Sequence, residues 1–214
     1  MSDPRLRALC LRFLETYEER LMRTAAARTY HHARRGGLVE HVAQMMRAAV
    51  ALLKVYHELN ADLVVAGVLF HDCGKLWENS YQKAGFVMPH REVGELIGHI
   101  SLGIELINKL WRDLLADEEA EDWENMEPRS EEVRMHLVHL VASHHGTHEF
   151  GSPVLPKTPE AALLHFVDNI DAKLEMFKEG YATSALLGKN VFDRRRPLYH
   201  PLVRPLPKFS GEDD

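Results

Sequence analysis

The chain has 214 residues, of which 45% are hydrophobic and 27% charged, and this balance is typical of a globular protein rather than a disordered or fibrous one. The length suits one domain with a well-buried core and is short for two. The net charge of −6 argues against a broad basic surface for nucleic acid. The longest apolar run, Leu63 to Phe70, is far shorter than the about 20 residues of a membrane span, which excludes membrane insertion.

The number of cysteines indicates the redox state of the cellular compartment. Cys10 and Cys73 are too few for a disulfide framework, and no signal peptide is recognisable at the N-terminus. We therefore predict a reducing, cytoplasmic setting. Cys73 is expected to be a small core residue rather than a ligand.

The first part of the chain predicts two helices. Residues 5–28 carry a helical stripe of apolar side chains and are expected to form a packing helix. A break over residues 29–37 ends in Gly36-Gly37 and opens the next helix at Leu38. His41 falls on the face of that helix that enters the core. It is either a hydrogen-bonded core residue or a metal ligand.

The most informative stretch runs from Ala66 to Lys75. Residues 61–70 are almost all apolar, which predicts a helix buried on every side, and this helix ends in His71-Asp72. An ionised carboxylate in such surroundings is costly unless it is paired or binds a metal. The pair therefore predicts the floor of a metal site, the alternative being a core histidine and a structural aspartate. We expect Gly74 to end the helix in a left-handed conformation and Lys75 to offer a charge to a phosphate.

The next segment alternates between loop and helix. Residues 77–89 show no period and are expected to form a loop, with Tyr81 and Lys83 available to contact substrate. Residues 91–115 predict one long helix. His99 lies on its flank beside Gly98 and Gly103, whose small size leaves room for a hydrated ion.

An acidic stretch, residues 116–132, is expected to be a solvated connection without chemistry. The helix that follows places His144 at the middle of its apolar face, and His145-Gly146 ends it.

The last helix begins after Thr158-Pro159, an N-cap followed by proline at the first helical position. Asp168 and Asp171 share one face of it, and the spacing does not choose between them. From about Asn190 the chain is rich in proline and is expected to form an extended arm over the surface or onto a partner. Because no stretch alternates with period two, the predicted fold is all-α.

The predicted helices carry imidazole and carboxylate side chains that could bind a common cation. Nitrogen and oxygen ligands without thiolate suit Mn, Fe, Co, Ni or Zn. Six ligands exceed one tetrahedral shell and fit two ions about 3.5 to 4 Å apart, bridged by Asp72, which would clamp a phosphoryl group. The candidates are His41, His71, Asp72, His99, His144 and one of Asp168 and Asp171.

The order of these residues resembles the HD-domain metal-dependent phosphohydrolases, and more closely the HD domain of the YhaM-type 3′-to-5′ exoribonucleases. The segments that carry the resemblance are His31-His32-Ala33, Gly36-Gly37-Leu38, Glu40-His41, His71-Asp72-Cys73-Gly74-Lys75, Gly98-His99-Ile100, Ser143-His144-His145-Gly146, Gly151-Ser152-Pro153, and His165 with Asp168, Asp171, Ala172 and Lys173.

The resemblance implies a single helical bundle holding one or two divalent ions, with Asp168 as the last ligand. It implies an N-terminal packing helix over residues 1–30, an HD domain over 31–180 and a proline-rich arm over 181–214. The substrate would be a phosphodiester in RNA or single-stranded DNA. Those exonucleases carry an N-terminal OB-type domain where this chain has one helix before His31, so a short oligonucleotide or a nucleotide is also expected as substrate.

For such a site we hypothesise roles for individual residues. Asp72 would hold the ions and orient or deprotonate a water, and Lys75 would neutralise charge on the phosphoryl oxygens. His145 or His31 would bind phosphate or protonate the leaving group, and Tyr81 and Lys173 would contact substrate. Partners that orient the ligating imidazoles are expected from Glu40, His139 and His165.

Other functions fit the same pattern. A nucleotide or alarmone phosphohydrolase is the first alternative, and an HD-type di-iron oxygenase uses much the same ligands. A pure binding module would be expected to lack some ligands, and here none is missing. The sequence is compatible with an oligomer.

Overall fold

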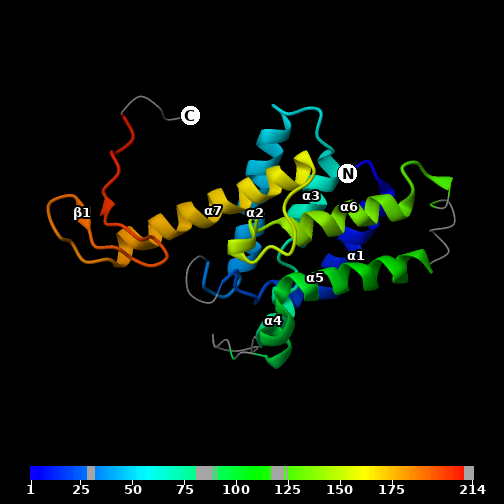
Figure 1. Cartoon of the computed structure of the whole chain (residues 1–214), viewed down its shortest axis with the longest axis horizontal. Coiled ribbons are helices and arrows are strands. Elements are labelled where there is room, and N and C mark those ends of the chain that lie inside the picture. Colours follow the sequence, from blue (N-terminus) through cyan, green and yellow to red (C-terminus); the bar gives the residue numbers. More distant parts are fainter. Residues whose placement is uncertain (28–31, 81–88, 90, 117–122, 124, 210–214) are drawn as a thin grey trace.

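The structure is a computed structural model, and it describes all residues except 28–31, 81–88, 90, 117–122, 124 and 210–214. The predicted all-α fold is confirmed (Figure 1). Its elements are α1 Pro4–Leu21, α2 Gly37–Leu53, α3 Ala61–Phe70, α4 Lys75–Glu78, α5 Glu92–Leu115, α6 Ser130–Ser143, a 3-10 turn at His148–Phe150, α7 Pro159–Thr183, and the short strands β1 Val191–Phe192 and β2 Leu202–Val203.

Helix α3 is the centre of the bundle. It packs against α1, α2, α6 and α7, and its apolar side chains belong to one core with those of its neighbours. Asn60 caps its N-terminus, where the side chain accepts a hydrogen bond from the N–H of Leu63 at 3.0 Å. Because α3 is enclosed on all sides, whatever follows its last turn is delivered to the inside of the protein.

Helix α1 is shorter than predicted, ending at Leu21 rather than near Arg28. The residues after it take part in specific backbone contacts that a helix would not allow. The carbonyl of Thr24 accepts from the N–H of Leu38 at 3.0 Å, and the carbonyl of Ala26 accepts from Lys75 Nζ at 2.5 Å. The residues after α1 thus contact both the start of α2 and Lys75 at the start of α4.

Two glycines differ from expectation. The predicted single helix over residues 91–115 is interrupted at Gly98, whose φ of 70° lies in the left-handed region that favours glycine. The break falls directly before His99. Gly74, predicted to be left-handed, instead has φ −65° and ψ −20° and precedes α4. Its lack of a side chain serves close packing, because a Cβ there would lie 1.9 Å from the carbonyl oxygen of His99.

The acidic stretch is more than a solvated connection. Trp123 is buried, its ring 6.5 Å from that of Trp111 on α5, and its carbonyl accepts from Ser130 Oγ at 3.0 Å. Cys10 and Cys73 are both buried free thiols. Within the described part of the chain, no helix has the length and apolar character needed to span a membrane.

We expect Gly74→Ala to destabilise the fold, by about 3 kcal/mol as judged by urea denaturation, because the new methyl group would push the α3–α4 turn away from α5. Gly188→Ala is the matched control, since a Cβ there meets nothing within 4 Å, and it should change stability by less than about 0.5 kcal/mol. Equal stability of the two variants would show that the contact between Gly74 and His99 is not tight.

Candidate metal centre

Two of the predicted ligands, His71 and His144, are oriented by the ends of their own helices. His71 Nδ1 lies 2.9 Å from the carbonyl oxygen of Val68, and His144 Nδ1 lies 2.7 Å from that of Val141. The last carbonyls of a helix have no partner within it, so each ring uses one of them as an acceptor. With Nδ1 donating, each Nε2 keeps its lone pair and faces the interior.

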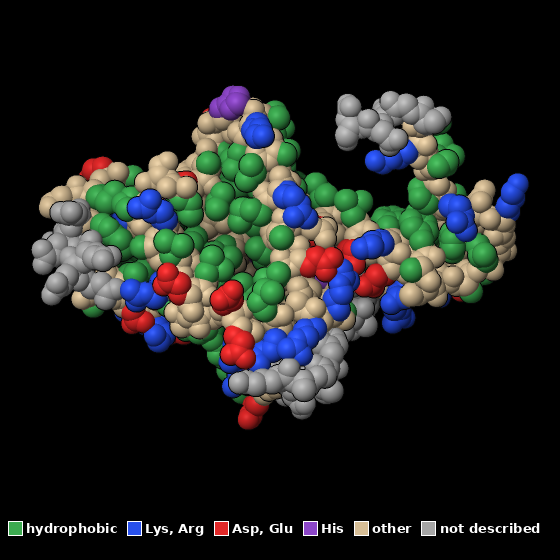
Figure 2. All heavy atoms as spheres, turned by 180° about the vertical axis from the view of Figure 1, so that it is seen from behind, with side chains coloured by type: hydrophobic (Ala, Val, Ile, Leu, Met, Phe, Trp, Pro, Cys, Tyr) green, Lys and Arg blue, Asp and Glu red, His purple; other side chains and the backbone are tan. Residues whose placement is uncertain are grey.

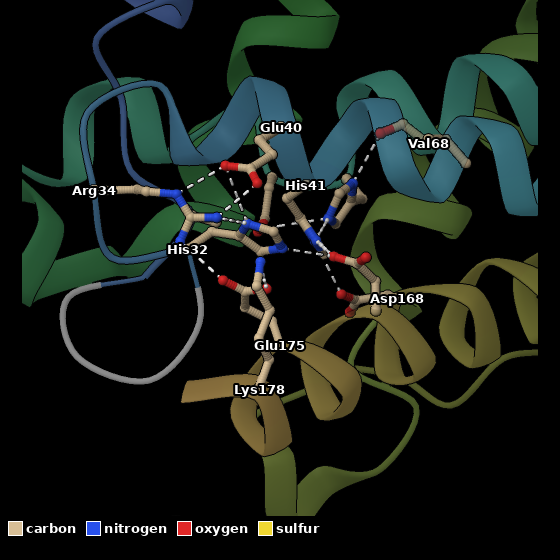
Figure 3. Close-up of polar contacts among 12 residues, drawn as sticks. His32, Arg34, Glu40, His41, Val68, Asp168, Glu175 and Lys178 are labelled. Carbon is tan, nitrogen blue, oxygen red and sulfur yellow. Dashed lines mark hydrogen bonds and ion pairs between the residues drawn. The ribbon is translucent and has the colours of Figure 1, made fainter. Parts of the chain in front are cut away.

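His41 lies between the two aspartates of α7 (Figure 3). Its Nδ1 is 2.6 Å from Asp171 Oδ2, and its Nε2 is 3.2 Å from Asp168 Oδ1 and 3.3 Å from His71 Nε2. Asp168 therefore lies on the side of the ring that faces the other candidate ligands, and Asp171 lies behind it. This position favours Asp168 over Asp171 as the ligand, which stays a prediction.

Asp72 faces both halves of the cluster. Its Oδ2 is 3.2 Å from His71 Nε2 and 2.6 Å from Lys75 Nζ. Its Oδ1 points the other way, 3.4 Å from His99 Nε2 and 3.7 Å from His144 Nε2. One carboxylate thus lies between two groups of imidazoles, as a bridging ligand would.

Three atoms of this cluster are buried without a hydrogen-bond partner among the described residues: Asp72 Oδ1, His99 Nε2 and His144 Nε2. An unsatisfied buried polar atom costs about 1–3 kcal/mol. Here the carboxylate oxygen and the neutral Nε2 of His144 are both acceptors and lie 3.7 Å apart, so neither can donate to the other, and a positive charge shared by them would satisfy both. This arrangement fits a divalent cation.

The acid–base properties of the cluster agree with this. Burial alone would raise the pKa of Asp72, but the charge of Lys75 and the contact with His71 outweigh it and hold this pKa well below its ordinary value. Burial lowers the pKa of His144 well below that of free histidine, so the ring is neutral. Both groups are in the forms that bind metals.

Grouped by distance, the cluster holds more than one set of ligand atoms. Within each set the atoms lie within 4.8 Å of one another. Two of the sets combine two histidines with an aspartate, and the third consists of three histidines. The sets are His41, His71 and Asp72; His99, His144 and His145; and His32, His41 and Asp171.

The family model for the HD domain matches residues 38–173. The chain belongs to the HD domain family. It is 39% identical over 177 residues to the 3′-5′ exoribonuclease YhaM of Oceanobacillus iheyensis, covering 82% of this chain and 50% of that protein. It is 37% identical over 208 residues to YhaM of Bacillus subtilis, covering 94% and 61%. The chain thus spans about half to three-fifths of the length of the curated relatives it matches. No solved structure matches.

The HD domain brings all six predicted ligands into one cluster from separate helices. His145, predicted to act on the phosphate or leaving group, lies beside it, its ring 4.3 Å from that of His144, and its Nδ1 is buried without a partner among the described residues. His31, Tyr81 and Lys83 lie outside the described residues.

Lys173 is exposed on α7. It follows Asp171 by two residues, which is about 200° around a helix, so the fold does not turn it toward the cluster. Its predicted phosphate contact stays a prediction.

Of the three residues predicted to orient the ligating imidazoles, only some lie near the cluster. His165 Nδ1 lies 2.9 Å from the carbonyl oxygen of His144, next to a ligand. Glu40 forms an ion pair with Arg34 at 2.6 Å and lies 3.6 Å from His32 Nδ1. The prediction fails for His139, whose Nε2 accepts from the N–H of Lys157 at 2.9 Å.

The sequence reasoning missed the groups that orient His41 and His99. His32 is fully buried, and its Nε2 is 2.9 Å from Asp171 Oδ2, the atom that also meets His41. Glu78 Oε1 lies 3.4 Å from His99 Nδ1. Periodicity gives no sign of either residue, because both lie outside the long helices. The motif His31-His32-Ala33 was the available signal for His32.

Replacing the two α7 aspartates by asparagine should separate their roles. Asp168→Asn removes the negative charge of a predicted ligand beside His41 Nε2, so we expect most of the bound metal to be lost. Asp171→Asn leaves the ligands in place but weakens the acceptor behind His41, which should lower metal affinity about 10- to 100-fold. Metal content and affinity, measured by elemental analysis and chelator competition, would check this. Asp113→Asn, on the exposed end of α5, is the control, and an Asp168→Asn protein with unchanged affinity would contradict the assignment.

Metal binding should also release a proton from His41. Burial favours the neutral ring, but the hydrogen bonds to Asp168 and Asp171 outweigh it and raise the pKa of His41 to about 9. Without metal the ring therefore carries a proton on both nitrogens at pH 7, and a cation must displace the one on Nε2. We expect apparent affinity to rise with pH up to about 9. Titration calorimetry with Mn²⁺ in two buffers of different ionisation enthalpy would measure the release, and identical heats in both would rule it out.

Proposed function

We propose that this HD domain is a divalent-metal-dependent phosphodiesterase that removes nucleotides from the 3′ end of RNA, and also accepts single-stranded DNA or short oligonucleotides. The observation that carries the proposal is the set of buried atoms on Asp72, His99 and His144 that form no hydrogen bond with any described residue. The relatives named as 3′-5′ exoribonucleases support the substrate and the direction. The free, buried thiols of Cys10 and Cys73 are compatible with a cytoplasmic location.

Two sets of residues would hold the cations. His41, His71 and Asp168 would bind one and His99 and His144 the other, with Asp72 shared between them. Their nitrogen and oxygen donors suit Mn, Fe, Co, Ni or Zn. Divalent ions at such a site supply a nucleophile at neutral pH and polarise the phosphoryl group.

Lys75 would serve both Asp72 and the substrate. Its ammonium group has three donors, of which one meets Asp72 Oδ2 at 2.6 Å and another the carbonyl of Ala26 at 2.5 Å. These two contacts fix the position of the Lys75 ammonium group beside the Asp72 carboxylate. The third donor can meet a phosphoryl oxygen and stabilise the charge that develops there.

His145 would be the first protein group to meet the phosphate outside the ligand set. Burial and the neighbouring His99 lower its pKa, so the ring is neutral at pH 7 and offers one N–H donor and one acceptor. The donor can hold a phosphoryl oxygen. His31, Tyr81 and Lys173 are proposed as further substrate contacts.

Asp72→Ala should abolish activity and metal content together, because it removes the ligand shared by both sets. We expect hydrolysis of a 3′-overhang RNA in Mn²⁺ to fall by at least about 10³-fold. Asp72→Asn, which keeps the volume, and circular dichroism would separate loss of the site from loss of the fold. Asp113→Ala should behave as the parent.

A screen of the parental protein tests the substrate class. Hydrolysis of labelled RNA from its 3′ end supports the proposal, whereas activity confined to nucleotides or alarmones would replace it with a nucleotide phosphohydrolase. Purified protein that holds iron with an oxygen-sensitive absorption band would indicate the oxygenase alternative. Turnover at the parental rate in metal-depleted buffer would refute the scheme.

A further inference from the structure

Residues 184–209, which we call the C-terminal arm, differ in charge from the rest of the chain. They contain one acidic residue, Asp193, and six basic ones: Lys189, Arg194, Arg195, Arg196, Arg204 and Lys208. The arm therefore carries +5 within a chain of net charge −6, which leaves −11 on all other residues. A polyanion approaching the protein would be repelled by most of its surface and attracted by this segment.

The arm has a defined structure at the end of α7 (Figure 1). Strands β1 and β2 pair antiparallel, Val191 opposite Val203. Three of its side chains form a small apolar cluster with the last turns of α7, and Tyr181 donates from its hydroxyl to the carbonyl of Val203 at 3.0 Å. The cluster consists of Phe192, Leu198 and Leu202 against Met176, Phe177 and Tyr181. The backbone of the arm between β1 and β2 is thus packed against the end of α7.

Some basic residues of the arm contact other residues of the chain, and others are exposed without an ion pair to a described residue. Arg195 pairs with Glu179 at 3.7 Å, and the guanidinium of Arg204 lies 5.0 Å from the ring centre of Phe192. The side chains of Lys189, Arg194, Arg196 and Lys208 are exposed, and none forms an ion pair with another described residue. Figure 2 shows basic side chains gathered on the arm among hydrophobic ones.

Aromatic rings are interleaved with these charges. Tyr199 is 82% exposed and Phe209 79% exposed, far more than aromatic side chains in the helical core. Exposed rings within a basic track are typical of proteins that bind single-stranded nucleic acid, where bases stack on the rings and cations meet the phosphates.

We propose that the C-terminal arm binds the single strand of the substrate, with phosphates on Lys189, Arg194, Arg196 and Lys208 and bases stacked on Tyr199 and Phe209. This inference rests on the proposed function, since it gives the strand whose 3′ end enters the metal centre a second point of contact. A protein partner with an acidic surface could form ion pairs with these basic residues. Such a partner would not account for the two exposed rings, on which bases can stack.

The length of α7 determines how far the arm lies from the metal centre. Asp168 and the last residue of the helix, Thr183, are 15 residues apart, or about 22 Å along the axis. At the about 3.4 Å spacing of stacked nucleotides, this corresponds to about six nucleotides. The arm should therefore matter for strands clearly longer than about six nucleotides and not for shorter ones.

The test compares two triple variants of the full chain. Arg194→Gln, Arg196→Gln and Lys208→Gln remove three charges from the arm. Arg7→Gln, Arg47→Gln and Lys54→Gln remove three exposed charges from α1, α2 and the residue after α2. The acidic residues Glu212, Asp213 and Asp214 stay in both. Affinity is measured by fluorescence anisotropy in Mn²⁺ with single-stranded RNA of 4 and 16 nucleotides carrying 3′ phosphorothioate linkages that resist hydrolysis.

We expect the parent to bind the 16-mer at least tenfold more tightly than the 4-mer. The arm variant should lose about tenfold in affinity for the 16-mer with little change for the 4-mer. Its plot of log affinity against log salt should become shallower by about 2, since each phosphate contact on a single strand contributes about 0.7. Tyr199→Ala with Phe209→Ala should weaken binding without changing this slope. The α1 and α2 variant should match the parent.

Equal loss in both triple variants, or no dependence on length in the parent, would overturn the inference. So would a change of oligomeric state in the arm variant, by light scattering, with RNA binding unaffected, because the arm would then dock on protein. If RNA is hydrolysed but the arm variant behaves as the parent, the inference fails alone. If the arm binds RNA and no hydrolysis occurs, the proposed function fails and the binding surface stands.

Discussion

The structure depends on the convergence of acceptor atoms inside the bundle. Asp72 Oδ1 and the Nε2 atoms of His99 and His144 are buried and close to one another, and no hydrogen bond from another described residue satisfies them. Such an arrangement is unfavourable for the bare chain, since each unsatisfied buried atom costs about 1–3 kcal/mol. It becomes favourable when a cation is bound. The fold therefore holds these atoms in place for the metal at a cost in stability that binding of the cation offsets.

The surrounding helices keep these atoms from relaxing. The rings of His71 and His144 are anchored to carbonyls of the helices that carry them, and His41 is held by Asp171, which is itself held by His32. Lys75 ties Asp72 to the turn after α1 through Ala26. His71, His144 and Asp72 are thus oriented by neighbours three residues away, whereas His41 depends on Asp171 and His32, which are distant from it or from each other in the sequence.

Periodicity and capping residues predict most of the helices, as α2, α3 and α7 begin within a residue or two of their predicted starts. The ligands follow because a polar residue on an apolar helical face needs a partner, as for His41 and His144. What could not be predicted depends on contacts between helices. The close approach of Gly74 to His99, the break at Gly98 and the early end of α1 are decided by neighbours that local sequence does not reveal. Helical spacing alone likewise does not distinguish Asp168 from Asp171, and the expectation of Asp168 comes from the family resemblance.

The position of His71 at the first residue beyond α3 has a consequence for how this protein can change over evolution. Both the direction of the ring and its acceptor, Val68, are set by counting residues back from the helix end. Exchanging one apolar residue of α3 for another alters packing only slightly. Inserting or deleting a single residue would rotate everything after it by about 100°, carrying the imidazole and the adjacent carboxylate away from the other ligands. The length of this helix is therefore under stronger constraint than its composition.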